Sequence, residues 1–330
     1  MKMTNNLTRV LFATALAATS CFFIYAADQN VPDHELLLIV GSPGEPKYKE
    51  GFHSAAEAWI RAANSTNARL KVVGLEDGDD SDHDKIENWI NDLEAKSPVP
   101  AWIVYIGHGT HTQKRTSLNL NGPDLTATDM AFWLDRLERT FIFIHGGSAS
   151  APFINKLSKP NRILMTATRS GEELNYARFG ERFAMVIESR DGDANQDGQV
   201  SLLEAFVATA RSVESFYEEN KRLASEHALI DDNGDSTGTP ADWFRGERLI
   251  KTPKDDRSPD GFRSRQIAFI ASEQESLLSP DQRQKRNQLE LELEHHRAKK
   301  SKLDEAAYYD QLEAILLKLS KIYLATDRDS

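Results

Sequence analysis

The chain has 330 residues, 40 % of them hydrophobic, which is enough to bury a sizeable core. Its formal net charge of −11 argues against a nucleic acid partner, because binding phosphates requires a basic face. Cys21 is the only cysteine and lies in the N-terminal apolar segment, so removal of that segment would exclude disulfides, thiolate nucleophiles and thiolate metal sites.

Residues 1–26 have the pattern of a signal peptide. Lys2 and Arg9 form a basic start, an apolar run follows, and Ala26 ends a plausible cleavage site. We therefore expect an exported protein, periplasmic or secreted, with no membrane contact after cleavage. A lipoprotein using Cys21 and an uncleaved N-terminal anchor are the alternative interpretations.

The residues up to Thr168 alternate between apolar runs and helical patterns. This order predicts an α/β fold with a mainly parallel sheet and helices on both faces. The predicted strands are 35–40, 68–75, 102–106, 139–144 and 162–168, with 116–120 as a short excursion. The predicted helices between them are 47–63, 85–95, 126–137 and 152–157, and the acidic run 76–82 is expected to cap the second of these at Asp82.

Beyond Thr168 the sequence predicts mainly helices. Helices are expected at 176–188 and 202–223, followed by a loop over 231–260 and one short strand at 266–270. The tail predicts two helices, starting at the capping residue Ser279 and at Asp304, that form an αα-hairpin packed on the domain or on a partner protein. The expected organisation is 1–26 signal peptide, 27–175 α/β core, 176–271 helical extension and 272–330 helical hairpin.

The segment 193–204 matches the calcium loop of an EF-hand. Side-chain oxygens recur at the diagnostic positions, Gly198 allows the sharp turn, and helices are predicted on both sides. The predicted Ca²⁺ ligands are Asp193, Asn195, Asp197, Gln199 through its carbonyl, Ser201 and Glu204. The segment 231–235 starts similarly but lacks the later Gly and Glu, which favours an Asp/Asn turn; a single loop favours a structural ion over a sensor.

Two predicted parallel strands end in polar, glycine-rich loops. The first ends at Gly107-His108-Gly109, and the second at 145–151, where Ser148 and Ser150 follow a pair of glycines. Ligands of open α/β sheets bind outside the carboxyl ends of the strands. We therefore expect His108 and Ser148 at one crevice, with Ser42, Lys47 and Ser150 as candidate substrate-binding residues.

This arrangement resembles the caspase–legumain group of cysteine peptidases, which implies a three-layer α/β/α sandwich. In that group the catalytic His follows the third core strand and the Cys follows the fourth. Residues 105–109, Tyr-Ile-Gly-His-Gly, match the first motif, whereas Ser148 stands at the position of the Cys. The resemblance covers about 35–168 and implies a peptidase site at His108 and Ser148, with the amides of Gly109 and Ser148 as oxyanion donors.

The serine weakens the case for catalysis. A thiol ionises near pKa ~8.5 and its environment lowers this value, whereas a serine hydroxyl needs a base within hydrogen-bond reach. We therefore expect a catalytically impaired homologue that binds a peptide or protein ligand in the crevice. The alternatives are a serine peptidase or esterase, simple capping of strand ends by His108 and Ser148, and a zinc site formed by His108, His111 and His145.

Overall fold

The computed structural model describes residues 31–76, 81–113, 115–251, 253 and 258–326. The predicted signal peptide, Cys21 and residues 77–80 of the acidic run lie outside these ranges. Among the described residues, no helix has both the length and the apolar character needed to cross a membrane.

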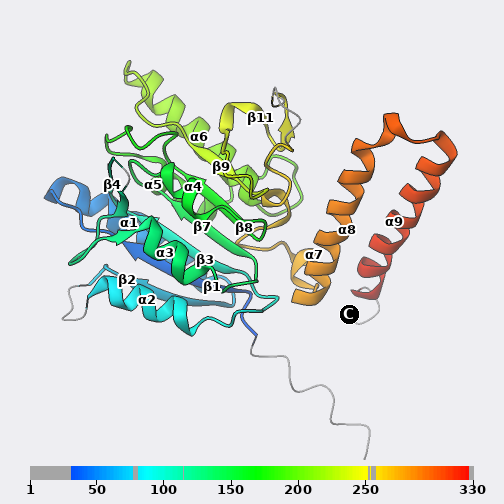
Figure 1. The fold of residues 1–330 in the computed structure, drawn as a ribbon, viewed down its shortest axis with the longest axis horizontal. Helices are drawn as coiled ribbons and strands as arrows, with labels where there is room; N and C mark the ends of the chain where they lie inside the picture. Colours follow the sequence, from blue (N-terminus) through cyan, green and yellow to red (C-terminus); the bar gives the residue numbers. More distant parts are fainter. Residues whose placement is uncertain (1–30, 77–80, 114, 252, 254–257, 327–330) are drawn as a thin grey trace, which may run out of the picture. The chain divides into compact units, whose positions relative to one another are not determined.

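A seven-stranded, mainly parallel sheet forms the centre of the domain (Figure 1). The five strands that the sequence predicted for this sheet all pair in parallel, and two short strands extend one edge antiparallel. The order across the sheet is β10-β9-β8-β7-β3-β1-β2. The strands are β1 (His34–Val40), β2 (Ala68–Val73), β3 (Ala101–Ile106), β7 (Phe141–His145), β8 (Arg162–Thr166), β9 (Leu229–Asp231) and β10 (Thr239–Pro240).

Helices cover both faces of the sheet. Successive side chains of a strand point to opposite faces, so Leu36 and Leu38 belong to one core and Leu37 to the other. The first core includes α1 (Pro46–Asn64), α5 (Phe179–Ser189) and α6 (Leu202–Glu219). The second includes α2 (Asp82–Asp92), α3 (Ala127–Leu134) and α4 (Pro152–Leu157). The predicted three-layer α/β/α sandwich is thus confirmed.

Smaller elements connect these layers. A separate three-stranded sheet follows β3, where the sequence predicted only a short excursion. It consists of β4 (Gly109–Thr112), β5 (Arg115–Leu118) and β6 (Leu125–Thr126). The hairpin of β11 (Phe244–Arg245) and β12 (Arg248–Leu249) lies within the segment predicted as loop.

The C-terminal segment forms the helices that its capping signals predict. Ser279 and Gln282 make a reciprocal capping box at the start of α8 (Pro280–Ala298), which pairs with α9 (Glu305–Thr326). A one-turn helix, α7 (Glu273–Ser276), precedes them.

Three local expectations were wrong. Ser81, not Asp82, caps α2, because its hydroxyl accepts the N–H of Asp84. Residues 266–270 do not form a strand, since only Ala268 makes a bridge, with Ser201, and residues 264–266 form a 3₁₀ turn. The segment 231–260, predicted as a loop, contains the strands β10, β11 and β12, which have two residues each and are too short to show a periodic pattern.

Candidate functional site

The loops that follow β3 and β7 lie side by side at the carboxyl edge of the sheet. These strands are adjacent and parallel, with Tyr105 in register with His145. The N–H of Gly146 donates to the carbonyl of Tyr105 at 2.9 Å, which extends the pairing past the strand ends. His108 and Ser148 therefore start from neighbouring loops, as the sequence predicted.

Glycines allow the two loops to approach backbone to backbone. A Cβ atom at Gly147 would lie 2.0 Å from the carbonyl oxygen of Gly107. A Cβ atom at Gly109 would lie 2.2 Å from the carbonyl oxygen of Ser148. Neither position has room for a side chain, so packing alone explains why glycines flank His108 and precede Ser148.

The Ser148 hydroxyl is bonded to the main chain of Gly109. Its Oγ accepts the Gly109 N–H at 3.3 Å and donates to the Gly109 carbonyl at 3.2 Å. The residue is only 2 % exposed. Within the described residues, no hydrogen bond joins Ser148 to the ring of His108. The Gly109 amide, a predicted oxyanion donor, already donates to the hydroxyl it was expected to assist.

The His108 ring lies among aromatic side chains. It packs edge-to-face against Tyr48, Phe52 and Tyr176, with centroid distances of 4.8, 5.2 and 5.9 Å. Burial lowers the pKa of His108, and a hydrogen bond to the Pro43 carbonyl partly offsets that shift. The imidazole is therefore held mainly by α1 and by the segment before α5.

The Tyr105 side chain hydrogen-bonds to the main chain of the His108 loop, a role that the sequence did not suggest. Its buried hydroxyl lies 2.6 Å from the His108 carbonyl oxygen and accepts the Asn119 N–H at 3.0 Å. Burial raises the pKa of this hydroxyl, so it stays protonated and able to donate. An apolar strand run gives no sign of such a role.

His145 is a second buried histidine at this edge. Its Nδ1 accepts the N–H of Gly147 at 3.1 Å, whereas its buried Nε2 has no hydrogen-bond partner. Burial lowers the pKa of His145 to about 3, so the ring is neutral with its proton on Nε2. The rings of Tyr105, Phe143 and Phe153 surround it.

The three predicted substrate-binding residues, Ser42, Lys47 and Ser150, differ in exposure and in hydrogen bonding. Ser150 is fully buried, and its hydroxyl accepts the N–H of Thr168 at 3.0 Å. Ser42 is partly buried beside Asn119, to whose carbonyl its N–H donates. Lys47 is exposed and pairs with Glu45 at 3.0 Å. Of these three residues, Lys47 alone is exposed to solvent.

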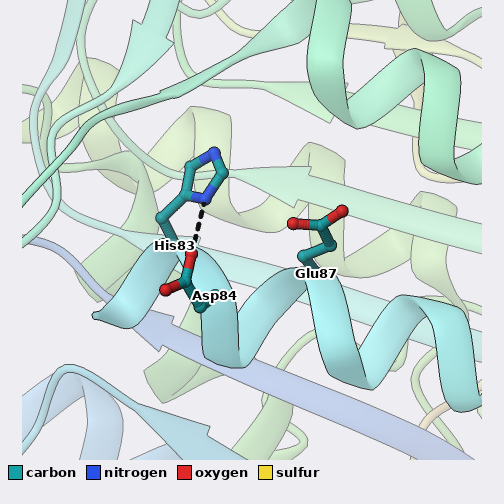
Figure 2. A group of neighbouring side chains, drawn as sticks. All are labelled: His83, Asp84 and Glu87. Atoms are coloured by element: carbon teal, nitrogen blue, oxygen red, sulfur yellow. Dashed lines mark hydrogen bonds and ion pairs between the residues drawn. The ribbon is translucent and has the colours of Figure 1, made fainter. Parts of the chain in front are cut away.

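The three histidines of the zinc alternative do not converge. His145 is buried among aromatic rings, and the ring of His111 is 2.7 Å from the Thr116 hydroxyl. In the described ranges, the one group of three or more His, Cys, Asp or Glu ligand atoms within 4.8 Å of one another is His83, Asp84 and Glu87 on α2 (Figure 2). These side chains are partly or largely exposed and follow one another along a helix surface, so they need no ion to explain them.

The predicted calcium loop lies between α5 and α6, as the motif requires. Asp193 accepts the N–H groups of Asp197 and Gly198 at 3.2 and 3.0 Å. Asn195 accepts the N–H of Asp197 at 2.9 Å. Gly198 has a φ of +86°, which favours glycine. The loop thus curves around the oxygens predicted to bind Ca²⁺.

Glu204 hydrogen-bonds to residues at both ends of this loop. Its Oε1 accepts the N–H groups of Ala194 and Asn195 at 2.9 and 3.1 Å, and its Oε2 accepts that of Ser201 at 2.9 Å. The carboxylate is 2 % exposed. Its two oxygens are therefore held at the position from which an EF-hand closes its ion site.

A residue outside the motif also reaches this loop. Glu247, in the β11–β12 turn, accepts hydrogen bonds from Asn195 at 3.2 Å and from the Ser201 hydroxyl at 3.1 Å. Burial and the charge of Glu204 raise its pKa. A sequence motif limited to 193–204 contains no signal for this contact.

Two cavities adjoin these elements. One of about 470 Å³ lies past the end of β8 and is lined mainly by apolar side chains, with Arg169 and His227 among the polar ones. One of about 350 Å³ lies beside the loop 193–204 and is lined mainly by polar residues, including Asp197, Glu247 and Arg286. Neither is lined by His108 or Ser148.

No family model and no curated protein matches this chain. Among solved structures, the Drosophila initiator caspase Dronc is similar with a TM-score of 0.43 and 11 % identity, over 72 % of this chain and 95 % of that one. A Geobacter sulfurreducens protein is similar with a TM-score of 0.36 and 11 % identity, over 60 % and 92 % of the two chains. Neither likeness bears on the activity of this chain.

Proposed function

We propose that this chain is a caspase/legumain-like protein without peptidase activity, which binds a peptide or protein ligand at the carboxyl edge of its sheet. The observation that carries the proposal is the engagement of Ser148 with the Gly109 main chain. His108 follows the third strand of the central sheet in chain order, and Ser148 follows the fourth. This is the order that the sequence resemblance implies.

The contacts of the two residues oppose nucleophilic catalysis. A serine nucleophile needs its proton taken by a base within about 2.6–3.2 Å. Both hydrogen bonds of Ser148 go to Gly109, and the His108 ring is held by Pro43 and three aromatic residues. Activation would require both side chains to leave these contacts.

One feature favours the alternative, a serine peptidase or esterase. Ala149, directly after Ser148, has a φ of +51°, a conformation that costs a non-glycine residue on the order of 1 kcal/mol or more. Its N–H donates to the Glu173 carbonyl at 2.9 Å. Strained backbone beside a nucleophile occurs at active sites, so an assay must decide.

The test is hydrolysis of a mixed fluorogenic peptide and ester library, in the presence of calcium. We expect wild type to match His108→Ala and Ser148→Ala, because no base contacts the hydroxyl. Activity that disappears in both variants would overturn the proposal and establish a serine hydrolase. Circular dichroism of each variant serves as the folding control.

The ligand is proposed to contact the His108 loop. The partly buried Tyr48 packs against His108, and the Lys47 ammonium lies over the Tyr48 ring, so the two residues offer an aromatic ring and a cation to a peptide. A second partner surface is proposed on α9, which exposes Leu316, Leu317 and Leu324 by about half. A peptide array probed with wild type and with His108→Ala tests the first surface, since we expect the variant to lose the bound peptides.

We further propose that the loop 193–204 binds a structural Ca²⁺. Both carboxylate oxygens of Glu204 are held at the closing position, and α5 and α6 flank the loop. Ligand that binds only the folded state raises stability, so Ca²⁺ should raise Tm relative to chelator. Glu204→Gln should abolish most of that rise, whereas equal melting temperatures with Ca²⁺ and chelator would contradict the proposal.

Export to the periplasm or the medium is proposed from the pattern of residues 1–26. Mass spectrometry of the mature N-terminus distinguishes cleavage near Ala26 from lipidation at Cys21 and from retention as an anchor.

A further inference from the structure

Three buried aspartates surround the turn that follows β9. Asp231 ends the strand, Asp232 follows it, and Asp260 approaches from a later segment. Their exposed fractions are 0, 1 and 4 %. Buried carboxylates normally have hydrogen-bond donors at their oxygens or lie beside a cation.

Two of these carboxylates are fully bonded. Asp232 accepts the N–H of Gly261 at 3.0 Å on Oδ1, and the N–H and hydroxyl of Ser264, both at 2.8 Å, on Oδ2. Asp260 accepts the N–H of Asp232 at 2.9 Å on Oδ1 and the hydroxyl of Thr239 at 2.6 Å on Oδ2. Their role is structural, because they join the turn to the segment 260–264.

Asp231 differs from both. Its Oδ1 accepts the N–H of Gly234 at 3.0 Å, whereas its buried Oδ2 has no hydrogen-bond partner. The Ser158 hydroxyl lies near this carboxylate and lowers its pKa, and it accepts the N–H of Ser236. A buried carboxylate oxygen without a partner destabilises the folded state, and more strongly when the group is charged. A bound cation would remove that cost.

The following residues present further oxygens in the manner of the first calcium loop. Asn233 Oδ1 accepts the N–H of Asp235 at 2.8 Å, and Asp235 Oδ1 accepts that of Thr237 at 2.7 Å. The third and fifth positions of loop 193–204 make the same two bonds, at 2.9 and 3.1 Å. Asp231, Asn233 and Asp235 thus alternate along the turn as the ligands of a calcium loop do.

The local charge also favours a cation. Asp231, Asp232 and Asp235 are acidic residues of this turn, and the basic group of Arg263 interacts with Asp232. Burial raises the pKa of Asp260 to about 8, so this carboxyl keeps its proton at neutral pH. We propose that the turn 231–235 is a second Ca²⁺ site, with Asp231 Oδ2 as its buried ligand and Asn233 and Asp235 supplying further oxygens. The absence of His and Cys among the ligands fits a hard divalent cation.

The test measures calcium bound to the full chain after equilibrium dialysis, by elemental analysis, with excess Mg²⁺ present. Asp231→Asn keeps an acceptor for Gly234 but removes the charge, and we expect it to bind one calcium fewer than wild type. Asp235→Asn, at an exposed position, should lose the same ion with less risk to folding. Asp310→Asn, an exposed position on α9, controls for the loss of one charge.

Glu204→Gln separates the two sites, because it removes a ligand of loop 193–204 alone. Loss of calcium in Glu204→Gln but not in folded Asp231→Asn or Asp235→Asn overturns this inference and leaves the proposed function intact. Loss in the two turn variants but not in Glu204→Gln supports the inference and overturns the first loop. If Asp231→Asn does not fold, retention of all calcium by Asp235→Asn overturns the inference.

Discussion

Buried histidines make the stability of this fold depend on pH at the level of single residues. His34, at the start of β1, accepts a hydrogen bond from Trp102 Nε1 on Nδ1 at 3.1 Å, and its Nε2 is 2.9 Å from the Phe269 carbonyl. These two partners fit only the neutral ring with its proton on Nε2. Burial lowers the pKa of His34 to about 4.

We predict that acidification destabilises the fold through His34. An unfolded histidine titrates near 6.5, so the unfolded state binds more protons between pH 6.5 and 4. The His34 contribution is complete above pH 6.5 and is lost as the pH falls toward 4, by roughly 3 kcal/mol. Denaturant unfolding at several pH values measures this loss.

The variant His34→Gln should show a shallower decline in unfolding free energy over the same interval. His295→Gln, at an exposed position of α8, should leave the decline unchanged. His145, with a pKa of about 3, contributes in the same direction and remains in both variants. Parallel curves for wild type and His34→Gln would contradict the assignment.

For single residues, the sequence predicts which loop a side chain belongs to better than it predicts the hydrogen bonds that the side chain makes. The rule that polar residues follow parallel strands correctly placed His108 and Ser148 on adjacent loops. It did not show that Ser148 bonds to Gly109, because such a bond depends on sub-ångström backbone packing. Tyr105 was missed because an apolar strand run gives no sign of the bonds that its hydroxyl makes, and Glu247 was missed because its contacts are distant in sequence.

At the scale of elements, α5 begins without a capping side chain of its own. Its N-cap residue, Arg178, makes no side-chain cap. Glu226, from the segment before β9, instead accepts the N–H of Arg178 at 2.8 Å and that of Phe179 at 3.0 Å. The first N–H groups of a helix lack intrahelical partners, so a buried helix start requires such an acceptor. Glu226 is 4 % exposed.

Glu226→Ala is predicted to lower the unfolding free energy by about 2–3 kcal/mol, because it leaves these donors buried without partners. The Tyr217 hydroxyl, 3.0 Å from Glu226, would lose its acceptor as well. Glu226→Gln should cost less, since an amide oxygen still accepts. Glu219→Ala, exposed at the end of α6, should change stability by less than about 0.5 kcal/mol. Equal effects at positions 226 and 219 would show that the cap is unimportant.

Element prediction succeeded where a pattern was long and failed where it was short. Four of the five parallel strands, β1, β3, β7 and β8, are largely apolar runs buried on both faces, a pattern that can be recognised without knowing which strands pair. β9 has three residues and pairs antiparallel with β8 and β10, so the sequence carried too few alternations to reveal it. Residues 266–270 carried a strand-like composition but found a single bridging partner, Ser201.

At the scale of the whole molecule, the two large hydrophobic cores belong to the α/β domain, and the helical hairpin has a separate, small one. Both large cores contain sheet residues, and among the described side chains neither includes a residue of α8 or α9. The helical hairpin has its own small cluster of Leu278, Leu289 and Ile322. The sequence predicted the hairpin itself, but not that its buried apolar residues would form a cluster separate from the two large cores.

Polar contacts supply much of the connection between the hairpin and the α/β core. Gln266 Nε2 donates to the Asn287 carbonyl at 2.9 Å and to Glu290 at 2.8 Å. Arg283 pairs with Asp33 at 3.4 Å. Surface ion pairs typically contribute 0–1 kcal/mol each, far less than a shared apolar core. Local opening of the hairpin should therefore require less free energy than global unfolding.

We predict that backbone amides of α8 and α9 exchange with solvent deuterium at least about tenfold faster than those of α6, a difference of about 1.4 kcal/mol in opening free energy. α6 is the matched control, because it is also a long helix but its Phe206 and Val213 belong to a large core. Hydrogen exchange of the full chain, followed by mass spectrometry of its peptides, measures both. Equal protection would show that the hairpin opens only with the sheet, and that its polar contacts bind it as tightly as the core binds α6.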